Sequence, residues 1–378
     1  MNTDSNWDLI VLGLGGVGSA AAYHAALAGL RVLGIDQYSP VHNHGSSHGK
    51  TRVIRQAYFE HPAYIPLLRR AYELWESLEQ ASDQRLFVRT GLVEVGPVDG
   101  VVVPGVIRSA ERYGLDIEKL LIDQVQNRWP GLSASSEMAA VFESNAGYLK
   151  VESCVAAYLQ CAADQGAVCR HNETVRTWSA TTEGVVVETD QGRYSAARLI
   201  IAAGPWSGHV LSGLGVQLQV LRKHQYWFSA APAESDQSPH LPCFFFELPR
   251  GYFYGFPSID DNGIKVARHS GGQSVEIPTR GDYATDAEDL RLVQEFVREH
   301  LPGATTHLRS HAGCYYTMTS DEHFLIDTLP EHLNVVVIAG LSGHGFKFTS
   351  VLGEIAMHLA VGDTHDFNLD LFRINRFS

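Results

Sequence analysis

Apolar runs near both ends of the chain predict the same kind of unit, a buried strand followed by a helix. Residues 7–12 and 31–35 are short apolar runs typical of buried strands, and the Ala-rich residues 18–29 between them predict a helix. Residues 334–339 predict a further buried strand, followed by a helix over about 346–361. The first of these units has the length of a β-α-β motif.

The middle of the chain has a different pattern, in which apolar and polar residues alternate and aromatic residues are frequent. Between residues 218 and 316, strands are expected at 225–228, 252–256 and 264–269, and the turn signal Asp260-Asp261-Asn262-Gly263 predicts that the last two form a hairpin. Helices are expected at 64–79, 102–113 and 151–166, and strands near 167–169, 184–188 and 199–203. The change of pattern predicts two domains woven from discontinuous segments.

Composition and charge narrow the classes of partner. The chain has 378 residues, of which 45% are apolar and 19% charged, so large cores can form. Lys and Arg number 29 against 42 Asp and Glu, and the net charge of −13 argues against nucleic acid or an anionic membrane as the main partner. An anionic substrate would therefore need cations gathered locally.

One apolar stretch and the cysteines bear on location. Residues 9–30 contain no Asp, Glu, Lys or Arg and are long enough to cross a bilayer, but glycines at positions 13, 15, 16 and 18 interrupt them and no basic segment precedes them. A strand, a turn and a helix explain this stretch better than a membrane span. The five cysteines are widely spaced and contain no CxxC pair, which fits a reducing compartment. We expect a cytoplasmic protein without membrane contact.

A glycine-rich turn lies between the first strand and the first helix. Gly13-Leu14-Gly15-Gly16-Val17-Gly18 fits GxGxxG, in which Gly13 allows the tight turn, Gly15 the approach of a pyrophosphate and Gly18 close helix packing. Asp36 follows the second strand, where a carboxylate can accept ribose hydroxyl protons. An adenine dinucleotide is therefore expected. The motif does not separate NAD from FAD, but its place near the start of the chain and the β-rich middle favour FAD.

Two groups of polar residues follow Asp36. Arg52 and Arg55 are three apart, so on a helical turn they would share one face that suits a carboxylate or a phosphate; the alternative is a pair of surface arginines. His42, His44 and His48 could be metal ligands, but the surrounding Gly and Ser and the lack of a fourth ligand disfavour this. We expect no metal and a loop folded over the cofactor.

The predicted hairpin carries a second set of candidates. Tyr252, Tyr254 and Phe256 share one face of their strand, and Lys265 and His269 share a face of the partner strand. Lysine is scarce, with six in the chain, and Lys265 lies between Ile264 and Val266. Its ammonium group is either partly desolvated or extends outwards to solvent.

Two later segments are also candidates. Cys314 and Tyr316 would face the same side of a strand, although a lone cysteine is usually inert packing. Residues 340–348 join a buried strand to a helix through three glycines, whose backbone amides can approach a ligand. Lys347 in the first turn of that helix is unfavourable for the helix dipole, so an anion is expected to hold it there.

Several of these motifs, in this order, are found together in one family. GxGxxG with Asp36, GSSHGKTRVIR, YFYGFPS, IKVARH, GCYYT and GLSGHGFKF resemble the monomeric sarcosine oxidase family of flavin amine oxidases, almost from end to end. The departures are Lys50, where close relatives have Asp, and Ser47, where they have His. The resemblance implies an α/β fold of two domains (α+β in arrangement), similar to glutathione reductase and p-hydroxybenzoate hydroxylase. A Rossmann-like FAD-binding domain of residues 1–86, 149–218 and 321–378 would join a β-rich catalytic domain of residues 87–148 and 219–320.

The resemblance also implies a role for each candidate. It places Arg55, Lys347 and Tyr254 at the substrate, with the first two binding its carboxylate. It assigns catalytic positions to Lys265, Arg52, His269, Tyr316 and His344, with Lys265 near flavin N5 activating oxygen. The cofactor contacts that it implies are Gly13, Gly15, Gly18, Asp36, Ser46, His48, Thr51, Arg52, Val175, Cys314, Gly343, Gly345 and Lys347. Among these, Cys314 would form a thioether to the flavin.

The implied activity is oxidative demethylation of N-methyl amino acids such as N-methyl-L-tryptophan or sarcosine. The products would be the primary amino acid, formaldehyde and hydrogen peroxide, and the enzyme would act as a monomer on a small molecule and oxygen. The alternatives are an oxidase or dehydrogenase of a cyclic imino acid such as L-pipecolate, a nicotinamide dehydrogenase, and a dinucleotide-binding protein without catalysis.

Overall fold

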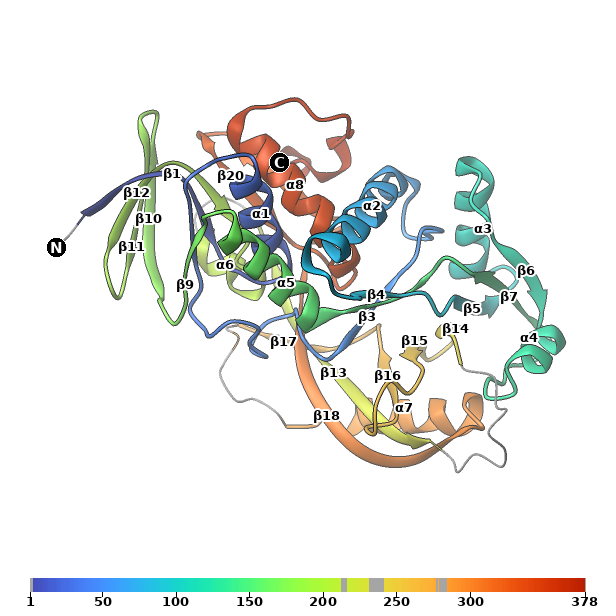
Figure 1. Ribbon diagram of the computed structural model, residues 1–378. Coiled ribbons are helices and arrows are strands. Elements are labelled where there is room, and N and C mark those ends of the chain that lie inside the picture. The colour runs from blue at the N-terminus through green and yellow to red at the C-terminus, as the bar shows by residue number, and fades with distance from the viewer. Residues whose placement is uncertain (1–2, 212–215, 231–240, 277, 279–283, 378) are drawn as a thin grey trace.

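The strands predicted at both ends of the chain belong to one eight-stranded sheet (Figure 1). The computed structural model describes residues 3–211, 216–230, 241–276, 278 and 284–377. Five strands of this sheet are parallel, in the order β9 (Val168–Arg170), β2 (Val32–Ile35), β1 (Thr3–Leu12), β12 (Arg193–Ile201) and β20 (His332–Ala339). β10 (Val175–Thr181), β11 (Gly184–Thr189) and β19 (Leu325–Leu329) add antiparallel strands.

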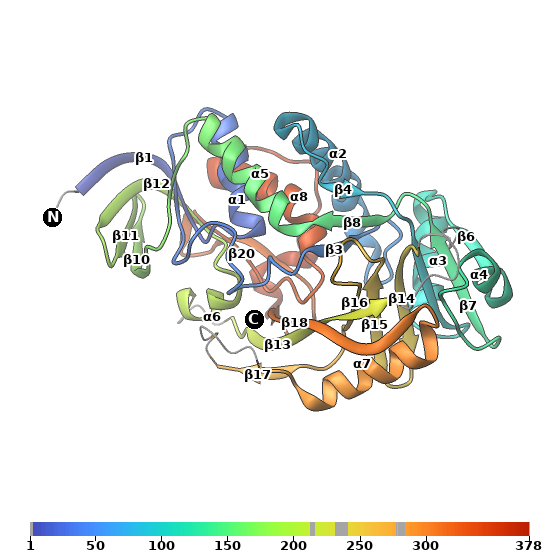
Figure 2. The ribbon, with the colours of Figure 1, turned by 60° about the horizontal axis from the view of Figure 1, so that its bottom comes forward.

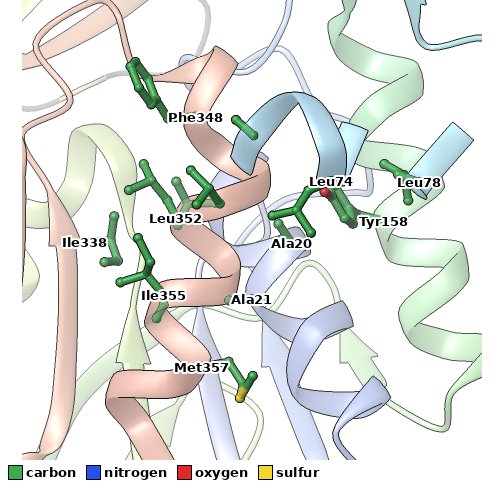
Figure 3. Packing of buried hydrophobic residues seen from close by; sticks show 14 of the residues in the cluster. Ala20, Ala21, Leu74, Leu78, Tyr158, Ile338, Phe348, Leu352, Ile355 and Met357 are labelled. Atoms are coloured by element: carbon green, nitrogen blue, oxygen red, sulfur yellow. The ribbon is translucent and has the colours of Figure 1, made fainter. Parts of the chain in front are cut away.

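Four helices pack together against the parallel strands and form the largest apolar core. They are α1 (Gly16–Leu27), α2 (Ile65–Ser82), α5 (Val151–Asp164) and α8 (Thr349–Val361). Figure 3 shows Ala20 and Ala21 of α1 beside Leu352 and Ile355 of α8. The two helices approach closely because small residues face each other: a Cβ on Gly353 would lie 2.5 Å from the Cβ of Ala20. This core holds the start of α1 in place, and with it the glycine turn.

A second, largely antiparallel sheet of nine strands forms the other half of the molecule (Figure 2). Its order is β17 (Gln273–Val275), β13 (Gln219–Ala230), β16 (Ile264–Arg268), β15 (Gly251–Phe256), β14 (Cys243–Leu248), β5 (Leu92–Pro97), β7 (Met138–Glu143) and β6 (Glu118–Leu121), with β18 (Ala304–Met318) paired to β13. Its helices are α3 (Val102–Tyr113), α4 (Ile122–Arg128) and α7 (Ala287–His300). The short strands β3 (Thr51–Ile54), β8 (Gly147–Lys150) and β4 (Phe87–Val88) form a third sheet between the two halves (Figures 1 and 2).

Most elements predicted from periodicity are confirmed. α3 has the predicted bounds, and β15 and β16 form the predicted antiparallel hairpin, with Tyr254 opposite Ala267 and Phe256 opposite Lys265. The apolar stretch 9–30 is strand, turn and helix, and no helix within the described residues is long and apolar enough to cross a membrane. The division into two domains at the predicted boundaries stays a proposal.

One local prediction is wrong. Arg52 and Arg55 do not share a face of a helical turn, because residues 51–54 form strand β3, which pairs with β8. In addition, the predicted helix over 346–361 begins with a 3₁₀ turn, η3 (Phe346–Phe348), that contains Lys347, so this residue precedes α8 itself.

Candidate active site

The carboxyl ends of the parallel strands meet at one edge of the first sheet, and a cavity begins there. The turns after β1, β2, β12 and β20 all contribute lining residues. This edge is the usual ligand-binding position in parallel α/β sheets. The cavity has a volume of 1380 Å³ and extends from this edge to the second sheet.

The glycine turn has the geometry that its sequence predicts. Gly13 has a φ of +84°, and a Cβ there would lie 2.5 Å from the carbonyl oxygen of Ala202. A Cβ on Gly18 would lie 1.7 Å from the carbonyl oxygen of Gly13, so only glycine lets α1 pack on this turn. The N-cap position of α1, Gly15, has no side-chain cap. The amides at the start of α1 thus face a cavity that can take an anion.

Asp36 lies at the cavity wall as predicted, but it also holds the glycine turn. Its carboxylate accepts hydrogen bonds from the backbone N–H of Leu14 (2.7 Å) and of Tyr38 (2.9 Å). Burial alone would raise the pKa of Asp36, but these bonds and His42, 3.5 Å away, lower it below its ordinary value. An ionised acceptor therefore lies beside the dinucleotide-type turn.

Arg55 lies at the far end of the cavity and is held by carboxylates. Its Nη2 donates to both oxygens of Glu60 (2.8 and 2.9 Å), and its Nη1 donates to Glu94 (2.9 Å). The guanidinium also lies over the rings of Tyr58 and Phe59, at 4.6 and 4.4 Å from their centroids. Arg55 is 4% exposed and lines the cavity, as does Glu60.

Lys347 reaches the same end of the cavity from the turn after β20. Its Nζ donates to the carbonyl of His344 (3.0 Å), and its own carbonyl accepts from Trp75 Nε1 (2.9 Å). Burial, with Arg55 next, lowers the pKa of Lys347 to about 7. An anion bound nearby would stabilise a buried ammonium group of this kind.

His344 of the same turn is fixed in one tautomer by its partners. Its Nε2 donates to the carbonyl of Glu322 (3.1 Å), so its Nδ1 accepts from the hydroxyl of Tyr58 (2.7 Å). Burial lowers the pKa of His344 well below its ordinary value. The ring is therefore a neutral part of the cavity wall.

Aromatic side chains from the second sheet complete this end of the cavity. Tyr254, Tyr316, His269 and Phe245 all line it. His269 Nδ1 lies 3.2 Å from the hydroxyl of Tyr316, and burial lowers the pKa of His269 to about 3, so the ring is neutral. Phe245 lies 6.1 Å from the His269 ring, measured between centroids. These side chains form an aromatic wall close to Arg55, whose guanidinium carbon lies 5.9 Å from the centroid of the Phe245 ring.

Lys265 is desolvated rather than extended to solvent. It is 2% exposed, and its Nζ donates to the carbonyls of Gly49 (2.6 Å) and Thr51 (2.9 Å). Burial, with the charge of Arg52 next, lowers the pKa of Lys265 well below its ordinary value. Lys265 does not itself line the cavity; it is hydrogen-bonded to Gly49 and Thr51, at the start of β3.

The other predicted cofactor residues divide into two sets. Lining the cavity are Gly13, Gly15, Asp36, Ser46, Arg52, Val175, Gly343, Gly345 and Lys347. Gly18, His48, Thr51 and Cys314 do not line it. Arg52 donates to the carbonyl of Ser46 (2.8 Å), and Ser46 Oγ donates to the carbonyl of Tyr315 (2.6 Å). Cys314 is a free, buried thiol on β18. The residues after it, Tyr315 and Tyr316, are both in the lining.

Sequence reasoning missed the acidic residues around Arg55. Glu60, Glu94 and Glu143 all lie in the electrostatic environment of Arg55, and Glu94 and Glu143 are buried. A signal for Glu94 was present, because it is a lone acid in the apolar run Leu92–Pro97. Lys223 was also missed: its buried Nζ donates to the carbonyls of His269, Ser270 and Gly271 and so fixes the backbone at His269.

Metal binding has no support in the described part of the chain, where no group of His, Cys, Asp and Glu is arranged to hold an ion. The residues do fit FAD. The start of α1 can take its phosphates through amides other than that of Gly16, which donates to Ser47 Oγ (3.1 Å). Asp36 can take its ribose, and the long cavity leads from there to Arg55 and Lys347.

Comparison with known proteins agrees with this fit. The sequence profile of the FAD dependent oxidoreductase family matches residues 8–359. The N-methyl-L-tryptophan oxidase of Salmonella dublin is 41% identical over 374 residues, covering 98% of this chain and 99% of that protein. The monomeric sarcosine oxidase of Bacillus sp. (strain B-0618) is 37% identical, with coverage of 98% and 96%. The fold is similar to that of NikD, an unusual amino acid oxidase essential for nikkomycin biosynthesis, with a TM-score of 0.87, 23% identity and 98% of each chain covered. The chain belongs to the family of FAD-dependent oxidoreductases.

Proposed function

We propose that this protein oxidises N-methyl amino acids, N-methyl-L-tryptophan or sarcosine, and removes the methyl group as formaldehyde. The observation that supports this most is the single cavity that joins the dinucleotide-type turn at Gly13 to the cations Arg55 and Lys347. The names of the relatives at 41% and 37% identity point to the same reaction.

Arg55 and Lys347 bind the substrate carboxylate in this proposal. A guanidinium fork can hold a carboxylate through two parallel hydrogen bonds, and the ammonium group of Lys347 adds a third donor. Glu60 already accepts two hydrogen bonds from the Nη2 of Arg55 and also lines the cavity, so the substrate carboxylate would bind beside it, between Arg55 and Lys347.

The aromatic wall orients the rest of the substrate and excludes water. Tyr254, Tyr316 and Phe245 offer flat apolar surfaces, and His269 and His344 are neutral, so none of them competes for the carboxylate. This wall suits an aromatic side chain such as that of N-methyl-L-tryptophan. Lys223 acts at a distance, by fixing the backbone that carries His269.

Bound FAD would supply the two-electron acceptor for oxidation of the amine to an imine, and oxygen would be the final acceptor, giving hydrogen peroxide. Water hydrolyses the imine to formaldehyde and the primary amino acid. Lys265 is proposed to favour the oxygen reaction through its positive charge. Burial lowers the pKa of Lys265, but the carbonyls of Gly49 and Thr51 that accept from its Nζ stabilise the ammonium form. The proposed thioether between Cys314 and the flavin rests on the resemblance of GCYYT and on the position of Cys314 beside two lining tyrosines. Action as a monomer in the cytoplasm stays a prediction.

A product assay in air tests this function. With N-methyl-L-tryptophan or sarcosine, formaldehyde and hydrogen peroxide are expected in equal amounts. N-methyltryptamine is the matched control, because it has the same indole ring and N-methyl group but no carboxylate. Peroxide from L-pipecolate without formaldehyde from either N-methyl amino acid would support the cyclic imino acid alternative. Electron transfer to a dye but not to oxygen would make the protein a dehydrogenase.

A further inference from the structure

The proposed carboxylate site is surrounded by more buried acids than cations. Arg55 and Lys347 are 4% and 6% exposed, and Glu94 and Glu143 are 1% and 4% exposed. Glu60 is the more accessible acid, with 18% of its side chain exposed. With every group ionised, two cations face three carboxylates before any ligand binds.

A ligand carboxylate would add a further negative charge to this buried cluster. Uncompensated charge is very unfavourable in a protein interior, and neighbouring carboxylates raise each other's pKa. A site of this composition can hold a carboxylate only if one of its own acids becomes neutral. The hydrogen bonds and solvent exposure of Glu60, Glu94 and Glu143 indicate which acid this is.

Glu143 and Glu60 both have more polar contacts than Glu94. Burial raises the pKa of Glu143, but the hydrogen bonds that it accepts from the backbone N–H of Gln56 (2.8 Å) and Ala57 (2.9 Å) oppose the rise. Glu60 accepts two bonds from Arg55 and is partly exposed to solvent.

Of the three acids, Glu94 has the fewest contacts that stabilise its ionised form. Within the described residues its carboxylate accepts one side-chain hydrogen bond, from Arg55 Nη1 (2.9 Å). It lies on β5 between Val93 and Val95, in a buried strand. Burial is the main cause that raises the pKa of Glu94 to about 8; Glu143 and Glu60 raise it further, while Arg55 and Lys347 oppose the rise.

We propose that Glu94 takes up a proton when a carboxylate binds Arg55 and Lys347, so that the anion enters without adding net charge to the buried site. This inference rests on the proposed function, because it takes Arg55 and Lys347 as the carboxylate-binding pair. A protonated Glu94 still accepts the hydrogen bond of Arg55 through its carbonyl oxygen. The guanidinium charge is then free for the ligand.

The proton balance has a consequence for the reaction. An N-methyl amino acid arrives as a zwitterion and must lose its ammonium proton before its nitrogen can be oxidised. One proton leaves the amine and one enters Glu94, so charge is conserved within the site. A carboxylate without an amine must instead take the proton from solvent. Proton uptake from solvent is therefore the signature of this role.

The test uses the FAD-loaded enzyme and indole-3-acetate, a carboxylate with an indole ring and no amine. Binding is followed by the flavin absorbance and proton uptake by a pH-indicator dye at about pH 9, above the pKa of Glu94. Lys347, with a pKa of about 7, is also neutral at this pH, but any proton that it takes up is common to the wild type and to Glu94→Gln and cancels in the comparison. Glu94→Gln keeps the shape and stays neutral, so it should take up about one proton fewer per ligand than the wild type. It should also bind about tenfold more tightly than the wild type at about pH 9 and equally at about pH 6.5, because only the wild type must first be protonated.

Equal proton uptake in both proteins, or an affinity ratio that does not change with pH, would overturn the inference and assign the proton to another group such as Lys347. Failure of both indole-3-acetate and acetate to bind would instead overturn the carboxylate site, and with it the proposed function.

A second measurement needs no folded Glu94 variant. Difference infrared spectroscopy of the wild type should show the carbonyl stretch of a protonated carboxyl group growing as indole-3-acetate binds, which a lysine cannot produce. The exposed Glu111→Gln is the matched control and should keep this band. A wild-type spectrum at about pH 9 without the band, or its loss in Glu111→Gln, would rule out Glu94 as the proton acceptor.

Discussion

Replacing Lys347 by methionine should make the protein more stable and its carboxylate binding weaker. The two side chains have similar length, and Met leaves the backbone contact between the Lys347 carbonyl and Trp75 in place. Folding lowers the pKa of Lys347 from 10.5 to about 7. At about 1.4 kcal/mol per pKa unit, the buried ammonium group costs about 4 kcal/mol at pH 7. Loss of the hydrogen bond to His344 offsets about 1 kcal/mol, which leaves a net gain of about 3 kcal/mol.

The gain in folding stability of Lys347→Met over the wild type depends on pH. Because the folded pKa lies below the unfolded one, the unfolded chain binds more protons between about pH 7 and pH 10.5, and Lys347 makes the wild type more stable as the pH rises. Lys347→Met lacks this contribution. The difference in melting temperature should therefore be largest at or below pH 7 and should shrink towards pH 10.5.

Ligand binding should change in the opposite direction. A hydrogen bond to a charged group contributes about 1.5–3 kcal/mol, so the dissociation constant of indole-3-acetate should rise about 10- to 150-fold. Thermal unfolding and a flavin absorbance titration measure the two effects, and the exposed Lys119→Met is the control that should change neither. A lower melting temperature for Lys347→Met at pH 7 would refute the cost of the buried charge. An unchanged dissociation constant would refute the carboxylate role.

Three further substitutions test the other parts of the site. Gly18→Ala should abolish FAD binding, because its Cβ would lie 1.7 Å from the Gly13 carbonyl oxygen; a purified variant with a normal flavin spectrum would show that the turn adapts. Cys314→Ala should release FAD into the supernatant on acid precipitation, whereas the wild-type precipitate should stay yellow; release from both would exclude the thioether. Lys265→Met should slow reoxidation of the reduced enzyme while flavin reduction stays within about threefold in stopped-flow experiments, since the loss affects only the oxygen reaction. If flavin reduction and reoxidation slowed by the same factor, Lys265 would not act specifically in the reaction with oxygen.

The spacing of apolar residues correctly predicted those helices and strands whose local sequence fits only one kind of element. Residues 102–113 form α3 as predicted, and the turn at 260–263 joins β15 to β16, because apolar spacing and turn residues there agree. Arg52 and Arg55 show where local information fails. A spacing of three fits a helical face, but residues 51–54 are instead held in a strand by pairing with β8, about a hundred residues later.

Part of the candidate site could be predicted, because several of its residues lie in recognisable motifs. Their hydrogen-bond partners do not, and these could not be predicted. The acceptors of Lys265, Gly49 and Thr51, are 216 and 214 residues away along the chain. No local pattern could show whether Lys265 is buried or extended. Glu94 was missed for a different reason: an acid in an apolar strand is a visible anomaly, but its partner Arg55 becomes apparent only when β5 lies beside the end of β3.

Anaerobic reduction of the bound flavin by N-methyl-L-tryptophan tests the central claim most directly. The account predicts loss of the yellow flavin absorbance, with tryptophan and formaldehyde each formed in an amount equal to the flavin. N-methyltryptamine should reduce the flavin far more slowly, because Arg55 and Lys347 would have no carboxylate to hold. Flavin that stays oxidised with both N-methyl-L-tryptophan and sarcosine, or that is reduced equally fast by the amine without a carboxylate, would contradict the account.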